Sequence, residues 1–132
     1  DDWILIDDTY NANPSSFQRV LENLNKMFPE RRKIVVCGVM AELGDSSPEF
    51  HRKVGNTMVN CGVEKMFGLG GVEIEYYLAG WKNSGGGKTA AKHFNELTEL
   101  LHSFKATLQA EDVVLVKGSR SAKMERFVEA ML

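Results

Sequence analysis

Three polar loops in this sequence carry the side chains best suited to binding a ligand, and each follows a short apolar run. Residues 7–16 hold two carboxylates, a tyrosine and two asparagines, and such a connection is longer than the roughly two to six residues that a strand-to-helix turn needs. Residues 38–45 combine glycines with a carboxylate, and residues 117–121 place two cations beside a glycine. These loops define the candidate site that the rest of the chain must position.

The loop at residues 7–16 has the chemistry of a nucleotide-facing surface. A carboxylate such as Asp8 at the end of a strand can accept hydrogen bonds from ribose hydroxyls. Tyr10, Asn11 and Asn13 could contact a base, a phosphate or a neighbouring domain. A structural alternative stays open, in which Asp7 and Asp8 accept hydrogen bonds from loop amides and Asn13 only caps the following helix.

The loop at residues 117–121 could bind an anion. Gly118 lets the chain turn after a strand, and a helix is expected to begin directly afterwards, where free N–H groups and the helix dipole favour negative charge. Lys117 and Arg120 add formal charge, and an arginine can hold a carboxylate through two hydrogen bonds. The expected ligand is a phosphate or a carboxylate, and the alternative is a solvated turn in which Ser121 caps the helix.

The loop at residues 38–45 offers the carboxylate of Glu42, and its glycines let a ligand approach the backbone closely. Its alternative interpretation is a loop closed by the cap-plus-proline pattern of residues 46–48. His51 follows in the first turn of the next helix, where a lone histidine is more often structural than catalytic. His51 stays a candidate for substrate binding, and no residue of this chain is predicted to be catalytic.

The elements that must position these loops alternate along the chain. Largely apolar runs predict strands at residues 3–6, 34–37, 63–69 and 113–116, and residues 88–93 are a further candidate for a short strand. Residues 3–6 are apolar throughout, which is typical of a strand buried on both faces, and residues 88–93 are expected near the sheet edge. Strands that alternate with helices imply a three-layer Rossmann-like α/β domain, with a mostly parallel sheet of about five to six strands and helices on both faces.

Helical spacing of apolar residues predicts a helix after each of these strands. The first helix is expected to bury Phe17, Val20, Leu21, Leu24, Met27 and Phe28. The third is predicted over about residues 72–81. Cap signals precede three of the helices, at Asn13 with Pro14, at Ser47 with Pro48, and at Asn95.

A parallel sheet has a direct consequence for the three loops. The carboxyl ends of parallel strands share one edge, and open α/β sheets bind ligands outside that edge. Residues 7–16, 38–45 and 117–121 each follow a predicted strand. We therefore expect the loops to converge, although they are far apart in the sequence.

Composition narrows the possible classes of protein. The 132 residues suit one domain, predicted to span residues 1–132. A net charge of −2 with interspersed acids and bases argues against nucleic-acid binding, and no apolar run approaches the roughly 20 residues of a membrane span. Without a signal-peptide pattern or a CxxC motif, Cys37 and Cys61 are expected to be reduced, buried thiols of a cytoplasmic protein. His93 and His102 lack a ligand pattern, so no metal site is predicted.

Two glycine-rich segments do not fit the nucleotide-binding motifs that they approach. Residues 87–89 could end a P-loop, but GxxxxGK[ST] would need a glycine where Lys82 stands. Residues 68–71 fail the GxGxxG pattern because Glu73 occupies its last position. The chain begins with two aspartates and no Met, and we expect it to be a piece of a longer protein.

Three motifs together resemble the C-terminal domain of the Mur ligases. They are DDTYNANPS at residues 7–15, GVMAELG at residues 38–44 with His51, and LVKGSRS at residues 115–121 with Met124 and Glu125. They occur in this order and cover nearly the whole chain. The resemblance implies that the chain is the third domain of such a ligase, and that the N-terminal UDP-binding domain and the central ATPase domain lie outside it.

The resemblance also implies an activity in cytoplasmic peptidoglycan synthesis. In the family member with the best-fitting pattern, ATP phosphorylates the carboxylate of a UDP-N-acetylmuramoyl-tripeptide. The amine of D-alanyl-D-alanine then attacks the acyl phosphate and gives an amide, ADP and phosphate. The P-loop and the Mg²⁺ ligands belong to the central domain, over which this domain closes. The isolated domain is expected to be inactive, the protein a monomer, and nucleic acid and membrane are not expected as partners.

The family's pattern carries roles over to individual residues. It implies that Asp8 approaches the ATP ribose and that Tyr10, Asn11 and Asn13 lie near the nucleotide. The residues expected near the dipeptide or the acyl phosphate are Lys117, Ser119 and Arg120, with Glu42 and His51 as further substrate-binding candidates.

Two other functions stay open. One is a Mur-type or polyglutamate-type ligase domain that adds a different amino acid, and the motif combination at residues 10–13 and 117–120 argues against it. The other is a non-catalytic Rossmann-like module that binds a nucleotide or a protein. A P-loop segment upstream in the same gene would exclude that module.

Overall fold

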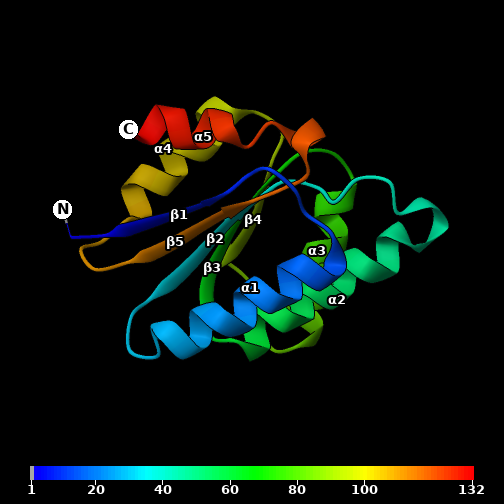
Figure 1. Cartoon of the computed structure of the whole chain (residues 1–132), viewed down its shortest axis with the longest axis horizontal. Helices are drawn as coiled ribbons and strands as arrows, with labels where there is room; N and C mark the ends of the chain where they lie inside the picture. Colours follow the sequence, from blue (N-terminus) through cyan, green and yellow to red (C-terminus); the bar gives the residue numbers. More distant parts are fainter. Residues whose placement is uncertain (1) are drawn as a thin grey trace.

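The computed structural model describes residues 2–132, which form a five-stranded parallel sheet with helices on both faces (Figure 1). The strands are β1 (Ile4–Asp8), β2 (Lys33–Cys37), β3 (Val63–Leu69), β4 (Ala91–Phe94) and β5 (Val113–Lys117). Their order across the sheet is β1-β5-β2-β3-β4, and every neighbouring pair is parallel. The predicted fold class is confirmed.

The helices divide between the two faces of the sheet. Helices α1 (Pro14–Met27), α2 (Ser47–Asn60) and α3 (Glu73–Asn83) pack on one face, and α4 (Leu97–Thr107) and α5 (Glu125–Met131) pack on the other. No helix within residues 2–132 is long and apolar enough to cross a lipid bilayer.

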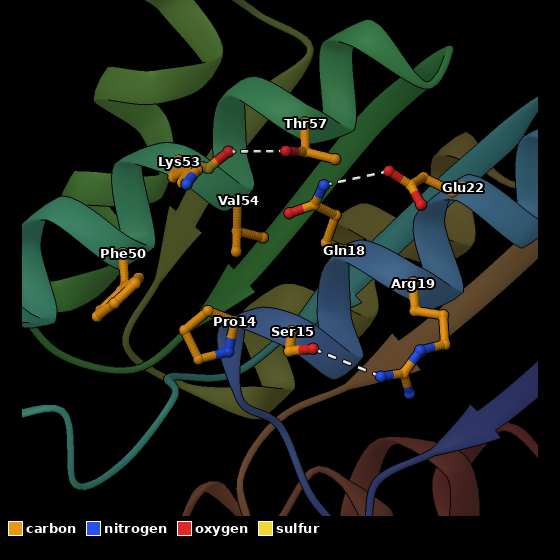
Figure 2. A pocket seen from close by; sticks show the side chains of 9 residues that line it. All are labelled: Pro14, Ser15, Gln18, Arg19, Glu22, Phe50, Lys53, Val54 and Thr57. Atoms are coloured by element: carbon orange, nitrogen blue, oxygen red, sulfur yellow. Dashed lines mark hydrogen bonds between the residues drawn. The ribbon is translucent and has the colours of Figure 1, made fainter.

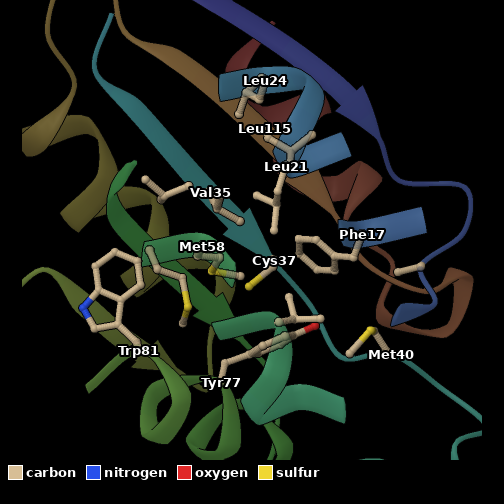
Figure 3. Packing of buried hydrophobic residues seen from close by; sticks show 14 of the residues in the cluster. Phe17, Leu21, Leu24, Val35, Cys37, Met40, Met58, Tyr77, Trp81 and Leu115 are labelled. Carbon is tan, nitrogen blue, oxygen red and sulfur yellow. The ribbon is translucent and has the colours of Figure 1, made fainter. Parts of the chain in front are cut away.

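The central strands supply both cores, which explains their unbroken apolar runs. In β2, Val35 and Cys37 pack against α1, α2 and α3 (Figure 3), whereas Ile34 and Val36 face the core under α4 and α5. Successive side chains of a strand point to opposite faces, so a strand covered on both sides must be apolar at every position.

Strand β1 corrects one prediction, because it lies at an edge of the sheet. It pairs with β5 alone, and its residues Ile4, Leu5 and Ile6 are half-buried instead of buried on both faces. An apolar run identifies a strand, but nothing within it shows whether another strand lies beyond. β1 also continues to Asp8, which stands in register with Lys117 at the end of β5.

Several helix details also differ from their predictions. Met27 is 65% exposed, because at 100° per residue it lies roughly 80° from the centre of the apolar stripe of α1. Ser47 is the first residue of α2 and does not cap it, and no side chain caps its start at Ser46. Glu96, and not Asn95, is the N-cap residue of α4.

Helices α2 and α3 cross at two glycines. A Cβ atom at Gly80 would collide with the carbonyl oxygen of Arg52, and one at Gly55 would collide with that of Tyr77. The two backbones are therefore too close for any larger residue at either position. This close packing places Tyr77 under the loop that follows β2.

Replacing Gly80 with alanine tests this helix crossing. Overpacking typically costs about 1–3 kcal/mol, and we expect Gly80→Ala to lower the free energy of unfolding in urea within that range. The better helix propensity of alanine, worth about 1 kcal/mol, works against this loss. In the control Gly87→Ala, the new Cβ would meet only Ala90 at 3.6 Å. Equal stability of the two variants would contradict the crossing geometry.

Candidate functional site

The loops after β1, β2 and β5 meet at the carboxyl edge of the sheet, as the parallel topology predicts. They surround a hollow of about 430 Å³, the three-loop hollow, which is lined by Asn11, Ala12, Ala41, Glu42, Ser119, Arg120 and Ser121. Two backbone hydrogen bonds join the loops after β2 and β5: Gly38 N–H donates to the Lys117 carbonyl at 2.9 Å, and Ser119 N–H donates to the Val39 carbonyl at 3.0 Å.

A hollow of similar size, about 450 Å³, lies between α1 and α2 (Figure 2). Its polar lining includes Arg19, Glu22 and Lys53, and none of the predicted ligand-binding residues. It opens on the surface of two helices, whereas ligands of open α/β sheets bind at the strand ends. We therefore place the candidate site at the three-loop hollow.

An ion pair ties the first and third loops together. The buried ammonium of Lys117, 1% exposed, donates to Asp8 Oδ2 at 2.7 Å and to the Asn11 carbonyl at 2.9 Å. Lys117 also lies against the ring of Phe17, with Nζ 5.7 Å from its centroid. This corrects the expectation that Lys117 presents a free charge to an anion. The Asp8 carboxylate is 36% exposed and still faces solvent.

The chain after β5 differs from its prediction in a second way. It forms a short 3₁₀ turn at Arg120–Ala122, and α5 begins only at Glu125. Ser121 lies inside that turn, and its hydroxyl pairs with that of Ser119 at 3.0 Å instead of capping a helix. No helix N-terminus therefore lies directly after β5, and the positive charge on this side of the hollow comes from Arg120.

Arg120 lies in contact with the first loop. Its guanidinium carbon is 5.2 Å from the centroid of the Tyr10 ring, which is 73% exposed. Stacking of this kind orients an arginine and leaves its N–H groups available. The structure thus joins two residues to which the sequence assigned different ligands, Tyr10 to the nucleotide and Arg120 to the substrate.

The contacts of Asn13 and Asp7 fit the structural alternative, in which Asn13 caps a helix and Asp7 accepts hydrogen bonds within the loop. Asn13 Oδ1 accepts from Ser16 N–H at 2.8 Å, and Ser16 Oγ accepts from Asn13 N–H at 3.2 Å, a reciprocal capping box at the start of α1. Asp7 Oδ1 accepts from the hydroxyl of Thr9 at 2.8 Å. Asn11 differs, because it lines the three-loop hollow.

The loop after β2 presents Glu42 to the hollow and is supported from below by His51. Glu42 has φ +63°, a left-handed conformation that is costly for a non-glycine residue and often marks a functional loop. His51 is fully buried: its Nε2 accepts from Met40 N–H at 3.1 Å, and its Nδ1–H donates to the Ser47 carbonyl at 2.7 Å. With both ring nitrogens engaged inside the protein, His51 positions the loop and does not reach the hollow.

Tyr77 is a supporting residue that the sequence did not reveal. Its buried hydroxyl donates to the Gly38 carbonyl at 2.9 Å, and its ring meets the His51 ring edge to face at 4.7 Å between centroids. The predicted helix over residues 72–81 includes Tyr77, but no local pattern points to a partner 39 positions away.

The described residues hold no assembled metal site or reactive thiol. Within residues 2–132, no three His, Cys, Asp or Glu side chains gather in a way that could hold a metal ion. Cys37 and Cys61 are unpaired, and burial raises the pKa of both thiols, which disfavours the reactive thiolate. Cys37 is fully buried, and Cys61 is half-buried.

A parallel α/β sheet with polar loops gathered at its carboxyl edge defines a Rossmann-like domain, a class whose ligands bind at that edge. Comparison of the sequence with protein families adds a match to the Mur ligase, glutamate ligase domain, over residues 1–120. The chain belongs to this family.

The relatives that are similar to this chain in sequence share one protein name. The chain is 38% identical over 131 residues to a UDP-N-acetylmuramoyl-tripeptide–D-alanyl-D-alanine ligase of Buchnera aphidicola, covering 98% of this chain and 27% of that protein. It is 36% identical to the Escherichia coli K12 protein of the same name, covering 97% of this chain and 26% of that protein. The chain thus spans about a quarter of the length of these relatives.

A solved structure shares the fold. The crystal structure of a MurF ligase from Thermotoga maritima in complex with ADP superposes with a TM-score of 0.80 at 28% sequence identity. The match covers 97% of this chain and 27% of that one. The resemblance to the Mur ligases inferred from the three motifs is confirmed.

The ion pair between Asp8 and Lys117 should contribute to stability. Asp8→Ala strands a buried ammonium, whereas Lys117→Met removes the charge and keeps an apolar stem of similar length. Removing one partner of a fully buried pair costs about 3–5 kcal/mol, and partial exposure of Asp8 reduces this to roughly 2 kcal/mol. In urea unfolding, Asp8→Ala combined with Lys117→Met should be more stable than Asp8→Ala alone. Strictly additive losses would contradict the pairing.

Burial of His51 should make stability depend on pH. Burial lowers the pKa of His51 in the folded state, because desolvation disfavours the charged ring more than the hydrogen bond to the Ser47 carbonyl favours it. The unfolded chain then binds a proton more readily, so the stabilisation is complete above about pH 6.5 and is lost as pH falls through the folded-state pKa. In thermal melts, the melting temperature of His51→Gln should fall less on acidification than that of wild type. The control His102→Gln removes an exposed histidine, and its melting temperature should depend on pH as in wild type.

Proposed function

We propose that this chain is the third, C-terminal domain of an ATP-dependent ligase that adds D-alanyl-D-alanine to a UDP-N-acetylmuramoyl-tripeptide in cytoplasmic peptidoglycan synthesis. Its N-terminal UDP-binding domain and central ATPase domain would lie outside this chain. The names of the relatives support the substrates. The observation that carries the proposal is the three-loop hollow, which gathers all three family motifs at one edge of the sheet.

The first loop forms the nucleotide side of the proposed site. Asp8 keeps an exposed carboxylate that suits the two hydroxyls of a ribose, and Lys117 holds that carboxylate in place. Asn11 lines the three-loop hollow, and Tyr10 stacks on Arg120 of that lining, so the pair offers a flat surface to a base and a charge to a phosphate. Asn13 acts through the capping box that fixes the end of the loop. The ADP complex of the Thermotoga relative is consistent with this assignment.

The other two loops form the substrate side. Arg120 and Ser119 would contact the carboxylate of the dipeptide or the acyl phosphate, and Glu42 offers an acceptor for an ammonium group. In this proposal His51 and Lys117 position the loops and do not touch substrate. Mg²⁺ would be held by the central domain.

The chemistry needs arrangement more than a reactive side chain. Transfer of the ATP γ-phosphoryl group to the tripeptide carboxylate gives ADP and an acyl phosphate, and attack by the amine expels phosphate and forms the amide. Both steps are accelerated mainly by positioning and by neutralising charge. A domain that closes over the central domain would bring a ribose anchor and an arginine to the reacting groups. A monomer suffices for this closure.

Kinetic assays of the full-length protein test the proposal. With UDP-tripeptide, ATP and D-alanyl-D-alanine, we expect Asp8→Asn to raise the KM for ATP about tenfold and Arg120→Ala to lower kcat/KM roughly 10–100-fold. The control Arg19→Ala removes a cation from the hollow between α1 and α2 and should be neutral. The 132-residue chain alone should show no turnover.

Several outcomes would contradict this assignment. Wild-type kinetics in both site variants would mean that the three-loop hollow takes no part in the reaction. Turnover by the chain alone would contradict its dependence on the other domains. Preference for a single amino acid such as glutamate would favour a different ligase of the same family. Absence of ATP-dependent amide formation with any amine would favour a binding module.

A further inference from the structure

A second crevice lies on the same edge of the sheet, between the loops that follow β3 and β4. It has a volume of about 500 Å³, and its walls include Gly70, Gly71, Asn95, Glu96 and Arg126. The chain leaves β3 towards α3 and leaves β4 towards α4, and these helices cover opposite faces. The two loops therefore diverge, which opens what we call the β3–β4 crevice.

The backbone N–H and carbonyl of Gly70 both attach one wall of the β3–β4 crevice to the edge strand β4. Gly70 N–H donates to the Phe94 carbonyl at 3.0 Å, and the Gly70 carbonyl lies 2.7 Å from Nε2 of His93. Gly70 has φ +149°, which L-residues rarely adopt, so this turn depends on glycine. The strand thus holds the loop at two points.

The same histidine is bonded at its other nitrogen. Nδ1 of His93 lies 2.6 Å from a carboxylate oxygen of Glu75 on α3. A carbonyl and an ionised carboxylate can only accept hydrogen bonds, so each ring nitrogen must carry a proton. A neutral ring would turn a nitrogen lone pair towards one of these oxygens and lose that bond. Both contacts can be hydrogen bonds at the same time only when the ring is an imidazolium.

We propose that His93 is a positioning residue: as an imidazolium held by Glu75, it fixes the Gly70 wall of the β3–β4 crevice and releases it on losing its proton. The ring is suited to this because its side chain is 17% exposed, whereas Glu75 is 57% exposed and supplies the counter-charge from the surface. The shape of this part of the edge then responds to pH, next to the hollow assigned to the ligase reaction.

Other charged groups line the β3–β4 crevice. Glu73 comes from α3, Glu96 from the loop before α4, and Arg126 from α5 across the crevice. Lys92, the preceding residue in β4, projects from the opposite face of the strand. β3 contributes the backbone of Gly68, which stands beside His93 in the sheet. Glu75 supplies the carboxylate that contacts His93, so replacing Glu75 is the most direct way to change the hydrogen bonding of the ring.

Nuclear magnetic resonance of the 132-residue chain tests the clamp independently of any ligase activity. Long-range ¹H–¹⁵N spectra at pH 6 should show protons on both ring nitrogens of His93. As the pH rises and the ring titrates, the exchange rate of the Gly70 amide, corrected for its intrinsic pH dependence, should rise about tenfold in step with that titration. A merely structural histidine would leave the exchange rate independent of its own titration.

Variants complete the test. His93→Gln should abolish the coupling between pH and Gly70 exchange, and Glu75→Gln, an exposed and conservative change, should weaken it while the fold is kept. The control His102→Gln should behave as wild type. An unprotonated ring nitrogen at pH 6, or Gly70 exchange that ignores the ring's titration, would overturn the proposal. If His93→Gln does not fold, the wild-type and Glu75→Gln titrations decide.

Discussion

The ammonium of Lys117 is the constraint on which the rest of the site depends. A buried cation must be matched by charge and hydrogen bonds, and within the described chain both of its hydrogen-bond acceptors come from the first loop: the Asp8 carboxylate and the Asn11 carbonyl. This requirement fixes the edge strand β1 against the central strand β5. The carboxylate proposed for the nucleotide is therefore held by a residue that does not itself face the ligand.

The position of β5 follows from the topology and shapes the whole edge. The last strand of the chain inserts between β1 and β2, so the first and last motifs become neighbours only when the sheet is complete. Because α1, α2 and α3 cover one face and α4 and α5 the other, the loops separate where neighbouring strands send the chain to opposite sides. The three-loop hollow and the β3–β4 crevice are two results of this one arrangement.

The site is built from loops that buried side chains support. His51 and Tyr77 hold the backbone of the loop that presents Glu42, and Tyr10 stacks on Arg120. Such groups orient and neutralise a charged ligand, which is the contribution expected of one domain of a phosphoryl-transferring ligase. The chain spans about a quarter of its relatives' length, and the proposal gives it only a part of the reaction.

The sequence by itself determined the element types, the α/β class, the convergence of the three loops and the family resemblance, because apolar periodicity records burial and the motifs are local. Only the tertiary structure decided that β1 is an edge strand, that Lys117 is an internal counter-ion, and that His51 supports a loop. These properties depend on contacts between distant residues: Lys117 and Asp8 are 109 positions apart. The same side chain can bind a ligand or neutralise a neighbour, and what surrounds it in the folded chain determines which.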